Sequence, residues 1–132
     1  MLESPAKILV AEDNPALVAV ISFNLRRSGL EVMAARNGRE AWEAAQASTF
    51  DVVVTDHQMP EMTGVELSQK LRGLPQYAQT PIIMLTAKGL ELDLNHLKTS
   101  LGIAAALPKP FSPVEMVKTV HDCLQRTHAA IA

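Results

Sequence analysis

Five short, mostly apolar runs of β-forming residues recur along the chain, and a stretch with a helical pattern separates each run from the next. The runs cover residues 7–11, 31–35, 51–55, 81–85 and 104–107. The segments with helical patterns cover residues 15–28, 39–47, 65–72, 90–101 and 113–126. Such strict alternation is typical of βαβ units, in which helices connect parallel strands. The sequence therefore predicts an α/β fold with five strands and five helices.

The third and fourth runs are apolar almost throughout, as the letters VVV at 52–54 and IIML at 82–85 show. Fully apolar strands are expected where helices cover both faces of a parallel sheet, so these two strands should be central. The 132 residues, 48% of them hydrophobic, suffice for one core. We expect a single domain over residues 1–132, with its core from about residue 7 to about residue 126.

Composition argues against several classes of function. The formal net charge of −2 gives no basic surplus for direct binding of nucleic acid. Cys123 is the only cysteine, which excludes an internal disulfide and suits a small core residue in a reducing compartment. No apolar run reaches the roughly 18 residues that a bilayer span needs, and residues 1–7 lack the pattern of a signal peptide. We therefore expect a cytoplasmic protein without membrane association.

Polar residues stand at the ends of four predicted strands: Glu12 and Asp13 after the first, Asp56 after the third, Thr86 after the fourth and Lys109 after the fifth. Ligands of doubly wound sheets bind at this edge. Three neighbouring carboxylates repel one another unless a cation intervenes, and Mg²⁺ prefers such oxygen ligands. The lysine and the hydroxyl suit the oxygens of a phosphoryl group. Each residue alone would more often be an ordinary loop residue, but their joint placement predicts a metal site with an aspartyl nucleophile.

The segment DHQMPEMTGVEL, residues 56–67, resembles the phosphoacceptor motif of two-component response-regulator receiver domains. The letters EDN at 12–14, LTA at 85–87 and KPF at 109–111 are similar to the acidic pair, the switch hydroxyl and the active-site lysine of that family. The resemblance covers residues 7 to 126. It implies a flavodoxin-like, doubly wound parallel sheet of order 2-1-3-4-5 with helices on both faces, and a cis peptide bond between Lys109 and Pro110.

The resemblance also implies roles for single residues. Asp56 would accept a phosphoryl group from a phosphohistidine. Asp13, Asp56 and the backbone carbonyl of Gln58 would bind Mg²⁺, and Glu12 would do so directly or through water. Lys109 and Thr86 would contact the phosphoryl oxygens.

The implied function is a phosphoacceptor signalling switch in a two-component phosphorelay, which is not an enzyme acting on a separate substrate. The implied partners are a sensor histidine kinase or histidine phosphotransfer protein and a downstream protein, and the chain should be a monomer or weak dimer. The segment 15–28 carries more apolar positions than one buried stripe needs. We expect some of them to stay exposed as a docking surface for phosphodonor helices. The alternative is that the additional positions make core contacts.

Other functions compete with this interpretation. A Mg²⁺-dependent phosphatase with an aspartate nucleophile would need a second acid two residues after Asp56, where Gln58 stands. A flavodoxin-type flavin site would need a first loop that accepts phosphate, which Glu12 and Asp13 would repel. An inert α/β domain would leave the convergent charges unexplained. The chain could equally be a receiver fragment of a larger regulator or of a hybrid kinase.

Some residues depart from the family pattern or carry no assigned chemistry. Ala106 takes the place of the usual aromatic switch residue, so we expect phosphorylation to reorganise residues 87–93 rather than the fifth strand. Pro108 favours an edge position for that strand. We expect His57 to be a solvated loop residue, and His96, His121 and His128 to be surface residues. We assign one further apolar stripe to the core: Val114, Val117, Val120 and Leu124.

Overall fold

The computed structural model describes residues 4–87 and 94–131, with the side chains of Leu94 and of residues 127–131 left aside. The elements, in chain order, are β1 (Lys7–Ala11), α1 (Pro15–Arg27), β2 (Glu31–Ala35), α2 (Gly38–Ala47), β3 (Val52–Asp56), α3 (Gly64–Arg72), the 3₁₀ helix η1 (Pro75–Tyr77), β4 (Ile82–Thr86), α4 (Leu94–Leu101), β5 (Ile103–Pro108) and α5 (Pro113–Ile131). The predicted alternation is confirmed, whereas η1 was not predicted. Across the described residues, none of the helices combines the length and apolar content of a membrane span.

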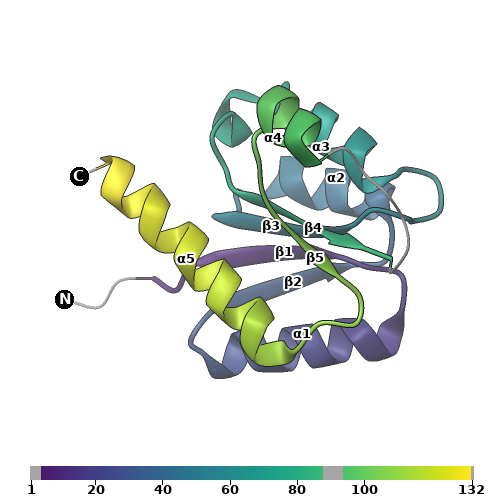
Figure 1. The fold of residues 1–132 in the computed structure, drawn as a ribbon, viewed down its shortest axis with the longest axis vertical. Helices are drawn as coiled ribbons and strands as arrows, with labels where there is room; N and C mark the ends of the chain where they lie inside the picture. Colours follow the sequence, from purple (N-terminus) through teal and green to yellow (C-terminus); the bar gives the residue numbers. More distant parts are fainter. Residues whose placement is uncertain (1–3, 88–93, 132) are drawn as a thin grey trace.

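The five strands form one parallel sheet of order β2-β1-β3-β4-β5. Helices α1 and α5 cover one face of it, and α2, α3 and α4 cover the other (Figure 1). The expected fold class and strand order are therefore confirmed, with β3 and β4 central and β5 at an edge. Pro108 ends that edge strand, where its missing N–H interrupts no ladder.

Each face of the sheet packs its own apolar cluster, because successive side chains of a strand point to opposite faces. The cluster beneath α2, α3 and α4 includes Leu9, Val53, Met84, Leu67 and Tyr77. The cluster beneath α1 and α5 includes Ile8, Val54, Ile83, Leu25 and Met116. Every residue of β3 and β4 is buried. The sheet is thus covered on both faces and holds its strand ends in fixed positions.

Local sequence signals set where the helices begin. Asn14 caps α1, and its side-chain oxygen accepts hydrogen bonds from the N–H groups of Ala16 and Leu17. Thr63 and Glu66 form a reciprocal capping box at the start of α3. These caps fix the starts of the helices that come after β1 and β3 in the chain.

Three strands, β3, β4 and β5, end one residue later than predicted, so that Asp56 and Thr86 belong to β3 and β4. The parallel ladder continues to those residues, since Asp56 pairs with Leu85 and Thr86 with Pro108. Backbone pairing rather than side-chain polarity decides where a strand ends. The predicted helix 90–101 is described from Leu94 onward, and residues 88–93 of the predicted moving segment lie outside the described residues.

The stripe predicted for the last helix needs one correction, because Val114 is 78% exposed. It lies in the first turn of α5, and the helix buries Met116, Val120 and Cys123 at a spacing of four and three residues. Val117 is half-buried. The expected exposure of apolar residues on α1 is confirmed, since Phe23 is 62% exposed.

Candidate phosphoryl-acceptor site

The structure brings the three predicted carboxylates together at the carboxyl edge of the sheet. Glu12 follows β1 and Asp56 ends β3, and both are buried, whereas Asp13 is exposed. One oxygen of each of the three residues lies within 4.8 Å of the others. Three carboxylates so close together destabilise one another unless a cation lies among them. Their all-oxygen chemistry fits a hard divalent ion such as Mg²⁺.

Lys109 supplies a fixed positive charge to the same cluster. Its Nζ lies 2.8 Å from Oε1 of Glu12 and 3.2 Å from Oδ2 of Asp56. Its own N–H donates to the carbonyl of Thr86 over 2.7 Å, and the bond from Lys109 to Pro110 is cis, as expected. Lysine and aspartate, 53 residues apart in sequence, thus meet because the ends of β3 and β5 lie at one edge.

Burial and neighbouring charges shift the pKa values of Glu12 and Lys109 in opposite directions. Burial raises the pKa of Glu12, and the neighbouring Lys109 ammonium only partly offsets that effect. For Lys109, burial alone would lower the pKa, but hydrogen bonds to Glu12 and Asp56 together raise the pKa above its ordinary value. The lysine therefore stays charged at neutral pH, as a group that contacts a phosphoryl anion must.

The two remaining predicted residues lie beside this cluster. Thr86 ends β4 and is buried, one position beyond the residue that pairs with Asp56. Gln58 follows Asp56 by two residues, and its side chain is exposed. An exposed side chain leaves any role in metal binding to its backbone carbonyl.

A glycine that the site prediction did not single out holds the end of β3 close to α3. A Cβ on Gly64 would lie 2.5 Å from the backbone oxygen of Asp56 and 2.7 Å from Sδ of Met84. The N–H of Gly64 also donates to the carbonyl of His57 over 2.9 Å. Only a residue without a side chain fits there. The sequence does contain a signal for this glycine, because Gly64 stands directly after Thr63, a residue type that commonly caps helices.

The histidines agree only partly with the predictions. His57 is half-buried rather than solvated, and its Nδ1 is buried with no hydrogen-bond partner among the described residues. The loop from β3 folds back through the bond between His57 and Gly64, which withdraws this side chain from solvent. His96 is exposed, and His121 is half-buried with Nε2 3.1 Å from Oγ of Ser28. The side chain of His128 lies outside the described residues.

Comparison with known proteins decides the family. Residues 8–121 match the model of the response regulator receiver domain. The chain belongs to this family. The receiver domain is 39% identical over 124 residues to the alkaline phosphatase synthesis transcriptional regulatory protein PhoP of Bacillus subtilis, covering 94% of this chain and 50% of that protein. It is 37% identical over 123 residues to the transcriptional regulatory protein SrrA of Staphylococcus aureus, covering 93% and 49%. The chain thus spans about half the length of these curated relatives.

Solved structures agree with this assignment. The receiver domain matches the chemotaxis response regulator CheY4 of Vibrio cholerae with a TM-score of 0.83 and 36% identity, over 91% of this chain and 99% of that one. It also matches the receiver domain of the sensor histidine kinase PA1611 of Pseudomonas aeruginosa, which was solved with a magnesium ion in its active-site cleft. That match has a TM-score of 0.81 and 28% identity, over 92% of this chain and 98% of the other. The predicted family is confirmed.

Proposed function

We propose that this receiver domain is a phosphorelay switch that accepts a phosphoryl group on Asp56. The observation that carries this proposal is the buried Asp56 carboxylate, whose Oδ2 lies 3.2 Å from the Lys109 ammonium in a cluster with two further acids. A carboxylate that only stabilised the fold would not need two acidic neighbours beside one lysine.

The reaction is a transfer between two nucleophiles. An oxygen of the Asp56 carboxylate attacks phosphorus, and the bond from phosphorus to the imidazole nitrogen of the donor breaks. The electron pair of that bond returns to the imidazole, and Asp56 becomes an acyl phosphate. Lys109 then pairs with phosphoryl oxygens in place of the free carboxylate, and the Thr86 hydroxyl donates to them. Asp56, Lys109 and Thr86 are thus the proposed residues of the transfer.

We propose Mg²⁺ as the cation of the acidic cluster, held by Asp13, Asp56 and the backbone carbonyl of Gln58, with Glu12 bound directly or through water. When bound, the ion neutralises charge on the transferring phosphoryl group. The PA1611 receiver supports this choice, because magnesium occupies its cleft. The side chains that carry the proposal are the three acids with oxygens inside 4.8 Å.

The phosphodonor would be a sensor histidine kinase or a histidine phosphotransfer protein in the cytoplasm. The exposed Val20 and Phe23 on α1 offer an apolar surface for its helices. The output would pass to a downstream protein. The receiver domain itself would be a monomer or weak dimer and would not contact nucleic acid directly. We propose that residues 1–132 form one domain, which spans about half the length of PhoP and SrrA.

The test is phosphorylation by acetyl phosphate with Mg²⁺, followed by intact mass. We expect one phosphoryl adduct on the unchanged protein and on Asp122→Asn, a control at an exposed acid of α5. Asp56→Asn should gain none. An adduct that persists in Asp56→Asn would contradict the assignment.

A second variant separates chemistry from docking. Phe23→Asp should slow transfer from a phosphohistidine donor and leave the acetyl phosphate reaction unchanged, because Phe23 lies outside the acidic cluster. Equal slowing in both reactions would mean that the variant disturbs the site, and no slowing would exclude α1 as the donor surface.

A further inference from the structure

The outer edge of β2 is open at its middle. The N–H of Glu31 donates to Ala6, and the N–H of Glu12 donates to Ala35, so residues 31, 33 and 35 face β1. Val32 and Ala34 therefore direct their backbone groups away from the sheet. Arg26 covers the carbonyl of Val32 over 3.2 Å. The N–H groups of Val32 and Ala34 and the carbonyl of Ala34 have no partner among the described residues.

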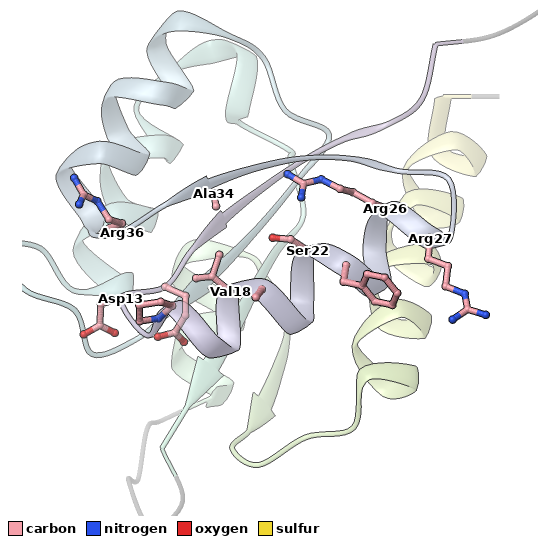
Figure 2. Close-up of a pocket in the computed structure, with 11 residues that line it drawn as sticks. Asp13, Val18, Ser22, Arg26, Arg27, Ala34 and Arg36 are labelled. Atoms are coloured by element: carbon pink, nitrogen blue, oxygen red, sulfur yellow. The ribbon is translucent and has the colours of Figure 1, made fainter.

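A groove of about 700 Å³ runs along this edge, between α1 and β2. Val18 and Ser22 of α1 and Ala34 of β2 line its middle (Figure 2). Ser22 is 95% buried from solvent, and its hydroxyl has no hydrogen-bond partner in the part of the chain that the structure describes. A methyl group at position 34 leaves this space unfilled. The groove can thus take one apolar side chain from a strand laid beside β2.

The charges of the groove differ between its two ends. At the end near the acidic cluster, Glu12 and Asp13 line the groove, and Arg36 already pairs with Glu40 at 3.0 Å. At the other end lie Arg26 and Arg27, which have no carboxylate within ion-pair distance among the described residues. Figure 2 shows Arg26 extending from α1 toward β2. The uncompensated positive charge therefore lies beside Val32, two residues from Ala34.

We propose that this edge binds an extended acidic peptide of a partner protein as a sixth strand. Edge addition supplies main-chain hydrogen bonds, and alternate side chains supply specificity. On the α1 side, an acidic residue would pair with Arg26, and an apolar residue two positions along would enter the groove at Ala34. The spacing of two follows from the strand period and places the two side chains about 7 Å apart.

Charge favours such a peptide over a second copy of this chain. A copy that paired through its own β2 would present Val32 and Ala34 on its α1 side, and neither is an acid that could pair with Arg26. An acidic strand instead meets a complementary charge. The inference uses the β2 edge and the facing residues of α1, so it does not depend on phosphoryl transfer at Asp56.

The test is an NMR titration of the protein with two peptides that carry one acid two positions from one apolar residue, TTETVTTTT and its reverse TTTTVTETT, so that both strand directions are covered. We expect saturating shifts at the amides of Val32, Ala34 and Ser22. A peptide with glutamine in place of the acid, and one with the apolar residue moved by one position, should both bind more weakly. Raised salt should weaken binding of the acidic peptide.

Variants of the protein complete the design. Arg26→Glu should weaken binding about fivefold or more, as expected when an attractive surface pair becomes repulsive. Lys118→Glu carries the same charge change on α5 and should leave binding unchanged. Ala34→Pro removes an N–H that the ladder to β1 does not use. If that variant fails to fold, Ala34→Leu, which fills the groove, takes its place, and either variant should abolish binding.

Three outcomes would overturn the proposal. The first is no saturating shift along β2. The second is a shift whose centre lies on another face, with Arg26→Glu binding as well as the unchanged protein. The third is concentration-dependent shifts at β2 without peptide, which would assign the edge to a second copy of the chain.

Discussion

The close approach at Gly64 predicts that Gly64→Ala damages stability and phosphorylation together. The added methyl would meet the backbone oxygen of Asp56 at 2.5 Å and the Cα of His57 at 3.0 Å. Backbone atoms cannot rotate aside as a side-chain tip can, so either α3 or the end of β3 has to move. Overpacking of this kind costs about 1–3 kcal/mol of unfolding free energy. Because one displaced atom belongs to Asp56, phosphorylation should also slow.

Urea unfolding followed by Trp42 emission measures the first effect, since Trp42 is the only tryptophan and packs against the cluster that includes Leu67. The rate of adduct formation with acetyl phosphate measures the second. Gly73→Ala is the matched control at the other end of α3. Its φ of −78° suits alanine, and its Cβ would meet only Lys70 O at 3.3 Å.

We expect Gly73→Ala to stay within about 1 kcal/mol of the unchanged protein. If Gly64→Ala were equally stable and accepted a phosphoryl group at the normal rate, the loop would have room to shift, and our reasoning about the packing of Asp56 against α3 would be wrong.

The remaining predictions concern the metal, the core and a cap. Asp13→Asn should weaken Mg²⁺ binding and slow phosphorylation together; normal affinity by titration of Trp42 emission would move the ligand role to Glu12. Tyr77→Phe should cost about 1–3 kcal/mol of unfolding free energy in urea, because the Tyr77 hydroxyl donates to backbone carbonyls and accepts from a backbone N–H in the buried interior; an unchanged midpoint would contradict this. Hydrogen bonds from the backbone and side chain of Thr63 lower the pKa of Glu66. Its stabilising effect is therefore present above the ordinary pKa and lost as pH falls through the lowered one, so Glu66→Gln should differ from the unchanged protein most at neutral pH and least in acid.

The sequence predicted which side chains lie together better than it predicted the element boundaries. Glu12, Asp13, Asp56 and Lys109 could be placed because the carboxyl ends of parallel strands share one edge, whichever residue ends each strand. The one-residue error at Asp56 and Thr86 did not change which side chains meet. A rule that depends only on topology tolerates such errors.

Burial and close packing were harder to predict, because they depend on neighbours distant in sequence. Val114 and Met116 both fit an apolar helical pattern, and only the position of α5 on the sheet exposes the first and buries the second. A Cβ on Gly38 would lie 2.5 Å from the Cβ of Met62, a constraint that no local pattern contains. The same holds for Ser22, whose buried hydroxyl has no hydrogen-bond partner among the described residues.

Ala106 stands where receiver domains usually carry an aromatic switch residue. It is half-buried, pairs with Met84 and packs against the cluster beneath α2, α3 and α4. A methyl group cannot alternate between a buried and an exposed position as a ring can, so phosphorylation has little to move at β5. A ligand shifts a conformational equilibrium only through contacts that differ between the states. We therefore expect the largest backbone NMR shifts beyond the site at residues 87–93 when a phosphoryl mimic binds Asp56. Larger shifts at β5 and α5 would refute this reasoning, because they would show that the sheet edge responds without an aromatic ring.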